Sequence, residues 1–223
     1  MLEATLTKPG HDLSSRSDAG TQFVALDTTV EELGEPEPPF VGPWTIERVH
    51  RMPRREGERY EIIDGDLIVT TSPHNRHQSV LIQFAFEIER WNRDTQRGRT
   101  LFAPGVIYSH TLALIPDLVW ASHERLKTID GTKGKLGGSP ELVVEVVSPG
   151  TVSEQRDRVA KLAVYAERDV AEYWIADWQA QTVEVYRRHE GNLALVETLR
   201  PGATLTSPLL EGFSCAVERL FNY

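Results

Sequence analysis

Residues 140–149 read Pro-Glu-Leu-Val-Val-Glu-Val-Val-Ser-Pro, and this stretch decides the fold class. Five of the six residues from 142 to 147 are leucine or valine, which is typical of a strand covered on both faces. Glu145 interrupts that run. A buried carboxylate costs several kcal/mol unless it is paired, protonated or bound to a cation. The stretch therefore predicts an interior strand that carries a carboxylate in need of a partner.

The residues after this strand predict a helix and a second strand. Thr151 and Glu154 have the spacing of a capping box, so we expect a helix over 153–168. Its predicted apolar stripe consists of Val159, Leu162, Ala163 and Ala166. A strand at 172–176 would follow and form a hairpin with 182–187. A strand–helix–strand unit of this kind predicts two neighbouring parallel strands.

The residues before the strand predict a hairpin, a helix and two further strands. Apolar runs at 59–63 and 66–70 flank Asp64-Gly65, which is a strong hairpin signal. A helix is expected over 77–93, with an apolar face made by Val80, Leu81, Phe84, Ala85, Ile88 and Trp91. Strands are expected at about 100–109 and 112–120. The order helix, three strands, helix, strand predicts an α/β domain with a mixed sheet.

A second acid lies in an apolar strand, in the sequence Ile-Pro-Asp-Leu-Val-Trp over residues 115–120. This acid is Asp117. Carboxylates on adjacent strands can converge on one divalent cation, and Mg²⁺ prefers oxygen ligands while keeping several waters. Lys161 lies two turns into the following helix and could stabilise charge on a transferring phosphate. The sequence therefore makes Asp117, Glu145 and Lys161 candidates for one site.

Simpler explanations exist for the same residues. Either acid could sit at an exposed strand end or pair with Arg or Lys. Lys161 could form a helical i,i+4 pair with Asp157, worth only about 0.3–0.5 kcal/mol. The positions of the three side chains in a structure would separate these explanations.

Charge divides the chain into two parts. The 223 residues carry a formal charge of −9, and residues 1–43 hold eight acids and two bases. We expect residues 1–43 to be an acidic, weakly ordered extension and residues 44–223 to be the folded domain. One cysteine, Cys215, excludes an internal disulfide and a multi-cysteine zinc site. No secretory signal or membrane span is visible, so we expect a cytoplasmic protein.

Several short motifs, taken in order, resemble one family. They are Tyr60-Glu61-Ile62-Ile63-Asp64-Gly65-Asp66-Leu67, Ser72-Pro73 with His77, Pro116-Asp117, 144–149, Lys161 with Tyr165, and 172–177. Over roughly residues 44–190 this pattern resembles the Uma-two family of endonucleases, in the restriction-endonuclease-like PD-(D/E)XK superfamily. The resemblance implies a mixed β-sheet flanked by helices, with core order α-β-β-β-α-β and added β-hairpins.

The resemblance also implies metal-dependent cleavage of phosphodiester bonds. Carried over by position, Asp117 and Glu145 are the metal ligands. The usual superfamily lysine falls at Val147, so Lys161 is the expected substitute. Glu61 and His77 also match family positions, Glu61 as a third acid near the metal and His77 as a residue facing the cleft. A cross-strand charge pair for Glu61, and local bonding at a helix start for His77, remain open.

These inferences predict an Mg²⁺-dependent endonuclease (Mn²⁺ as substitute) acting on nucleic acid, with DNA favoured. The five site residues are those just named: Asp117, Glu145, Lys161, Glu61 and His77. A symmetric dimer would suit an enzyme that cuts both strands. The alternative is a nucleic-acid-binding or structural protein of the same fold without cleavage, for which the missing lysine at position 147 is the best argument. A phosphohydrolase acting on small substrates is a third hypothesis.

Overall fold

The computed structural model describes residues 42–53, 55–131, 134–147 and 152–222. The extension predicted for residues 1–43 therefore lies outside the described residues up to position 41, and so does the capping residue Thr151. The first described element is a short helix, α1 (Ile46–Arg51), whose N-cap Thr45 accepts a hydrogen bond from the Arg48 backbone N–H. The predicted hairpin follows as β1 (Arg59–Ile63) and β2 (Asp66–Thr70). Asp64 and Gly65 both have positive φ, at 50° and 88°, as the tight turn requires.

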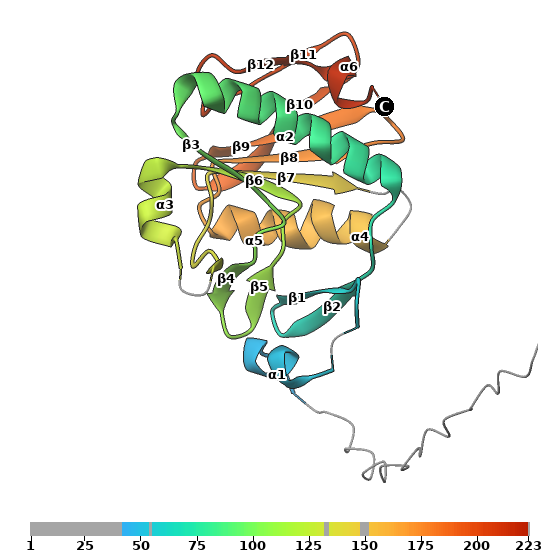
Figure 1. Ribbon diagram of the computed structural model, residues 1–223, viewed down its shortest axis with the longest axis vertical. Coiled ribbons are helices and arrows are strands. Elements are labelled where there is room, and N and C mark those ends of the chain that lie inside the picture. Colours follow the sequence, from blue (N-terminus) through green and yellow to red (C-terminus); the bar gives the residue numbers. More distant parts are fainter. Residues whose placement is uncertain (1–41, 54, 132–133, 148–151, 223) are drawn as a thin grey trace, which may run out of the picture. The chain divides into compact units, whose positions relative to one another are not determined.

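Two main sheets make up the β structure (Figure 1). The six-stranded sheet has the order β10-β9-β8-β7-β6-β3, and a four-stranded sheet has the order β2-β1-β5-β4. The strands of the larger sheet are β3 (Gly98–Phe102), β6 (Leu118–Ser122), β7 (Leu142–Val147), β8 (Glu172–Asp177), β9 (Thr182–His189) and β10 (Asn192–Leu199). The smaller sheet is completed by β4 (Val106–Ser109) and β5 (Leu112–Leu114), and β11 (Thr204–Thr206) pairs with β12 (Ser214–Ala216). Strands β7 and β8 are parallel, as the strand–helix–strand unit predicted.

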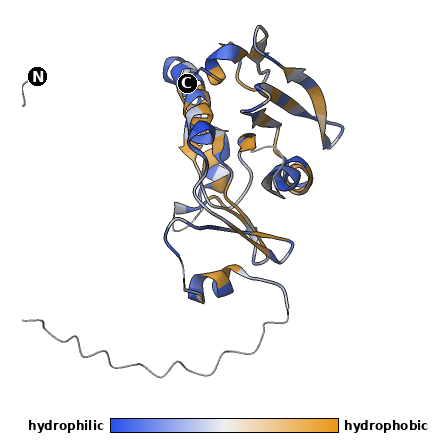
Figure 2. Ribbon diagram, turned by 90° about the vertical axis from the view of Figure 1, so that its right-hand side faces the viewer, coloured by the Kyte–Doolittle hydropathy of each residue, from blue (hydrophilic) through white to orange (hydrophobic). Residues whose placement is uncertain are grey.

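Helices cover both faces of the six-stranded sheet (Figure 1). One face carries α2 (Asn75–Thr95), and the other carries the continuous run of α4 (Val152–Gln155), η2 (Arg156–Lys161) and α5 (Leu162–Glu167). The remaining helices are α3 (His123–Ile129) and α6 (Val217–Leu220). In Figure 2 the helix ribbons carry both hydrophilic and hydrophobic colours, as expected of helices with one face in the core.

The alternation along β7 decides which way its acid points. Leu142, Val144 and Val146 pack into the core cluster on the α2 side, whereas Val143 and Val147 pack into the cluster on the α5 side. Because successive side chains of a strand point to opposite faces, Glu145 faces the α5 side. The same rule applied to Leu118 and Val119 of β6 puts position 117 on the α5 side too. The two acids therefore share one face of the sheet.

Three expectations about the elements were wrong in detail. Each of the strands expected at 100–109 and 112–120 is two strands that belong to different sheets. The breaks fall at Pro104 and Pro116, because proline has no N–H for the ladder. Helix α3 was not among the expected elements. Glu87 does not belong to the expected apolar face of α2, yet it is 4% exposed and pairs with Arg90 and Arg219.

The helix after β7 differs most from the prediction. Its middle section, η2, is a π-helix, whose wider turn changes which residues face the core. Val159, expected in the apolar stripe, is 62% exposed, and Ala163 is exposed as well. The buried residues of η2 are instead Asp157 and Lys161. No helix within the described ranges is long and apolar enough to cross a membrane.

Candidate active site

Asp117 lies immediately before β6, at the point where the chain passes from the four-stranded sheet to the six-stranded one. Its carboxylate is buried and has partners from three other elements. Oδ2 lies 2.9 Å from His77 Nε2 and accepts a 3.0 Å hydrogen bond from the Val146 N–H. Oδ1 accepts a 3.3 Å hydrogen bond from Arg59. Burial alone would raise the pKa of Asp117, but the hydrogen bond and charge of His77, with the charge of Lys161, lower it to about 2.

Glu145 lies in the middle of β7 and is 2% exposed. Its Oε1 accepts hydrogen bonds from Lys161 Nζ at 2.8 Å and from the Tyr165 hydroxyl at 3.2 Å. Its Oε2 accepts a 3.3 Å hydrogen bond from the backbone N–H of Asp117. The two predicted acids are therefore linked directly, through the main chain of one and the side chain of the other.

Lys161 has three carboxylate partners. Its Nζ lies 2.8 Å from Glu145, 3.1 Å from Glu61 and 3.3 Å from Asp157. We call these four residues the buried ion cluster, and each is 2–4% exposed. Glu61 also accepts a hydrogen bond from the Ile115 N–H. The cluster joins β1 of the small sheet to β7 of the large one and to the helix η2.

Burial and neighbouring charges strongly shift the pKa values of Lys161 and Glu145. Burial would lower the pKa of Lys161, but the carboxylates of Glu145, Glu61 and Asp157 hold it well above its usual value. Burial raises the pKa of Glu145 well above the usual range, and the like charges of Asp117, Asp157 and Glu61 add to the effect against the attraction of Lys161. One lysine surrounded by three acids keeps its proton, and the crowded acid at position 145 favours gaining one.

A cleft of about 370 Å³ opens beside this cluster. Its walls are the β2–α2 connection, the start of α2, Arg59, and the ends of β6 and β7, with Arg156 and Asp157 from η2. Asp117, Glu145 and His77 line it, whereas Lys161 and Glu61 lie behind Glu145 and are not among its lining residues. Arg59 and Arg156 are the cations that reach this cleft.

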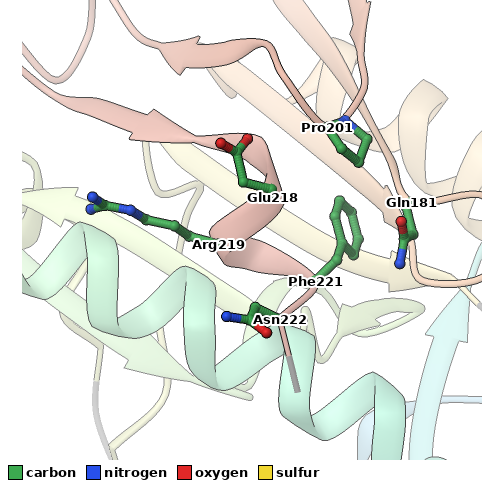
Figure 3. A pocket seen from close by; sticks show the side chains of 6 residues that line it. All are labelled: Gln181, Pro201, Glu218, Arg219, Phe221 and Asn222. Carbon is green, nitrogen blue, oxygen red and sulfur yellow. The ribbon is translucent and has the colours of Figure 1, made fainter.

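Two other hollows lack comparable chemistry. One of about 520 Å³ lies between α1 and the four-stranded sheet and is lined mainly by aliphatic side chains. The other, of about 260 Å³, is shown in Figure 3, where Glu218 and Arg219 of α6 lie with Phe221, Asn222, Pro201 and Gln181. Neither hollow contains a pair of buried acids, so the polar cleft at Asp117 is the candidate active site.

The donor set at the cleft suits a hard cation held by few protein ligands. Within the described ranges, no group of three or more His, Cys, Asp or Glu side chains is arranged to hold a metal ion. Mg²⁺, however, commonly binds one or two carboxylates and keeps its waters. Among the described residues, Asp117 Oδ1 and Glu145 Oε2 each accept one hydrogen bond, at 3.3 Å, and both residues line the cleft. These two carboxylates fit such a cation.

Comparison with known proteins identifies the family of this chain. Residues 46–218 match the model of the Uma2 family, whose description is "Putative restriction endonuclease". The chain belongs to the Uma2 family.

A crystal structure from Anabaena variabilis, of "a putative nuclease belonging to DUF820", superposes with a TM-score of 0.63. It shares 19% sequence identity and covers 80% of this chain and 98% of its own. At that identity the likeness shows the fold, which is the restriction-endonuclease-like α/β fold that the sequence predicted. No curated protein matches this chain in sequence.

In this Uma2 chain, four of the five predicted site residues gather around Glu145. Asp117 and Lys161 contact it directly, Glu61 contacts Lys161, and His77 contacts Asp117. Two of the open alternatives are present as contacts: Lys161 pairs with Asp157 at i,i+4, and Glu145 pairs with a lysine. The roles of these residues stay predictions.

Sequence reasoning missed three residues of this Uma2 site. Arg59 was seen only as part of a basic run, although it reaches Asp117. Arg156 pairs with Asp157 and lines the cleft, and nothing in its spacing pointed there. Asp157 was expected only as a helical partner of Lys161. Its position one turn before Lys161, on the helix that follows the strand of Glu145, was the signal that could have placed it in the site.

Proposed function

We propose that this protein is a divalent-metal-dependent endonuclease that hydrolyses phosphodiester bonds of nucleic acid, with DNA favoured as substrate and Mg²⁺ or Mn²⁺ as cofactor. The observation that carries the proposal is that Asp117 and Glu145 line one cleft on one face of the sheet. Membership of the Uma2 family supports the same reaction class. A protein that cuts both strands would work well as a symmetric dimer, which light scattering would measure.

Asp117 and Glu145 would hold the cation. When bound, a divalent cation supplies a more acidic water and offsets charge on the scissile phosphate. The remaining work falls to the chain's own side chains. His77 Nε2 and the Val146 N–H fix the Asp117 carboxylate, which leaves Oδ1 toward Arg59. Such fixed orientation lowers the cost of ordering the site when the substrate binds.

Lys161 acts through Glu145 rather than on the phosphate. Its ammonium group donates a hydrogen bond to Glu145 and lies within 3.3 Å of two further carboxylates, and its side chain is 2% exposed. Its charge offsets part of the repulsion between Glu145, Glu61 and Asp157, so Glu145 can stay ionised beside a cation. Lys161 is therefore a positioning residue. Arg59 and Arg156 line the cleft and supply the contacts to phosphate oxygens.

Cleavage assays test the proposal. Labelled single-stranded and duplex DNA and RNA are incubated with Mg²⁺ or Mn²⁺, and with EDTA. We expect metal-dependent internal cleavage that falls at least about 100-fold in Asp117→Ala and in Glu145→Gln. Glu87→Gln is the matched control, because Glu87 is an equally buried acid on α2 that does not line the cleft. Unchanged cleavage in both cleft variants would remove these residues from the reaction.

One observation favours the alternative, a nucleic-acid-binding protein without cleavage. Val147 stands where the superfamily usually has its lysine, and it is fully buried in the core. Calorimetric titration with Mn²⁺ separates the two functions. A nuclease binds the ion in a way that Asp117→Ala abolishes, whereas a degenerate site gives no binding that depends on Asp117.

A further inference from the structure

The cleft has an aromatic ring at its mouth that the proposed chemistry does not use. His74 lies in the connection between β2 and α2, is exposed, and lines the same cleft as Asp117. Its imidazole is stacked on the indole of Trp178, with ring centroids 5.2 Å apart and ring planes within 9° of parallel. The ring is therefore packed on Trp178, while the residue itself is exposed at the cleft.

We propose that His74 is a stacking platform for an unpaired base of the nucleic-acid substrate, and hence that the cleft takes a single-stranded segment. The inference rests on the proposed function, because it assigns the substrate's form at the same cleft. Bases stack on aromatic side chains in proteins that bind single strands, and the contact tolerates any sequence because every base has a π-face.

The ring is fixed before any substrate arrives. His74 is the N-cap of α2, and its Nδ1 accepts a 3.1 Å hydrogen bond from the Arg76 N–H. Beneath it, Trp178 is 9% exposed and follows directly after β8. The turn that holds Trp178 is closed by Asp177, whose Oδ1 accepts hydrogen bonds from the backbone of Gln179 and Ala180 at 2.9 and 2.8 Å. A ring held from both directions loses little freedom when a base stacks on it.

The platform is one helical turn from the acids. His77 follows His74 by three residues on α2, a rise of about 4.5 Å, and its Nε2 lies 2.9 Å from Asp117. A base resting on His74 would therefore belong to a nucleotide next to the phosphate at Asp117. In a duplex the base faces are covered by their neighbours in the stack. Only an unpaired or flipped base offers a face to the ring.

Binding of labelled oligonucleotides in EDTA, where no cleavage occurs, tests the platform. The probes are oligothymidylate, oligouridylate, a strand of abasic sites and a duplex of equal length. His74→Ser keeps a helix cap but removes the ring, and His74→Phe keeps a ring but removes the cap. We expect His74→Ser to weaken binding of the two pyrimidine strands about 5- to 30-fold, from a stacking energy of about 1–2 kcal/mol. His74→Phe should stay within about twofold of wild type, and the abasic strand should not distinguish the variants.

The binding results either support or overturn the stacking platform at His74. Equal affinity of His74→Ser and wild type, equal loss in both variants, or tighter binding of duplex than of single strands would overturn the platform. An equal loss with oligothymidylate and oligouridylate in His74→Ser alone would support stacking on the base rather than contact with the sugar. Cleavage by wild type with unaltered affinity in His74→Ser would overturn the platform and leave the nuclease standing. Ring-dependent binding without cleavage would support the platform and overturn the nuclease.

Discussion

Replacing Lys161 by methionine tests the buried ion cluster most directly. Methionine has a similar length but no charge, so Glu61, Glu145 and Asp157 would lose the ammonium that lies within 3.3 Å of each. Removing one partner of a buried ion pair typically costs about 3–5 kcal/mol, because the remaining charges stay buried without compensation. A domain of this size shifts its melting temperature by about 2–4 °C per kcal/mol, which gives a fall of about 6–20 °C.

The loss should depend on pH in a known direction. In the wild type the raised pKa of Lys161 keeps its stabilisation complete below the ordinary lysine pKa, and it is lost only as pH rises through the raised value. In the variant the pKa of Glu145, already raised by burial, loses the lowering effect of Lys161, so the folded state takes up a proton before the unfolded state does. Stability of Lys161→Met relative to wild type should therefore recover as pH falls from 7 to 5.

Urea unfolding followed by circular dichroism at several pH values measures both effects. Lys127→Met is the matched control, because Lys127 forms an exposed ion pair with Glu124 and its loss should cost less than about 1 kcal/mol. The reasoning fails if Lys161→Met costs no more than the control, or if the difference from wild type stays constant between pH 7 and pH 5. The double variant with Glu145→Gln should be more stable than Lys161→Met alone, because it removes one of the unpaired acids.

Three further predictions follow from the same contacts. Glu145→Gln without metal should melt at or above the wild-type temperature, because burial disfavours the charge of Glu145 and Lys161 still has Glu61 and Asp157 as partners. A melting temperature well below that of metal-free wild type would show that the ion pair with Lys161 dominates. Asp117→Asn should lose about 2 kcal/mol at pH 7, because folding lowers the pKa of Asp117 from 3.8 to about 2. In urea titrations this difference should shrink as pH falls from 4 to 2, because the unfolded wild-type chain takes up this proton before the folded one does. Removing residues 1–41 should change the melting temperature by less than about 2 °C, whereas cutting through Trp44, whose N–H donates to Gly65 at 2.7 Å, should lower it clearly in calorimetry.

Local sequence signals predicted the elements that depend on neighbouring residues. The Asp64-Gly65 hairpin and the apolar face of α2 came out as expected, because turn chemistry and helical spacing are properties of short segments. The strands expected at 100–109 and 112–120 ran through Pro104 and Pro116, although proline disfavours the middle of a strand. What spacing did not reveal is that the two halves would join different sheets, which depends on partners far along the chain.

The candidate site was predicted in its members but not in its contacts. The apolar run around Glu145 and the acid at 117 pointed to residues that the structure brings together at one cleft. The π-helical turn could not be seen, because the spacing of apolar residues was interpreted with the period of an ordinary α-helix. Helical spacing therefore chose Val159, and the structure buries Asp157 and Lys161 instead. His74 went unnoticed because its partner Trp178 is distant in sequence. The two rings meet because the start of α2 and the end of β8 lie side by side in the fold.

The buried ion cluster also has a consequence for the order of folding. Its contact between Glu61 and Lys161 joins residues that are 100 positions apart, and it links β1 of the small sheet to the helix η2. Loop-closure cost grows with the length of chain between two residues, so we expect this contact to form after the nearer ones. Glu145 and Lys161 are only 16 residues apart and can pair earlier. The third acid would then join a lysine that is already paired, and the ion cluster would be complete only when β1 has docked.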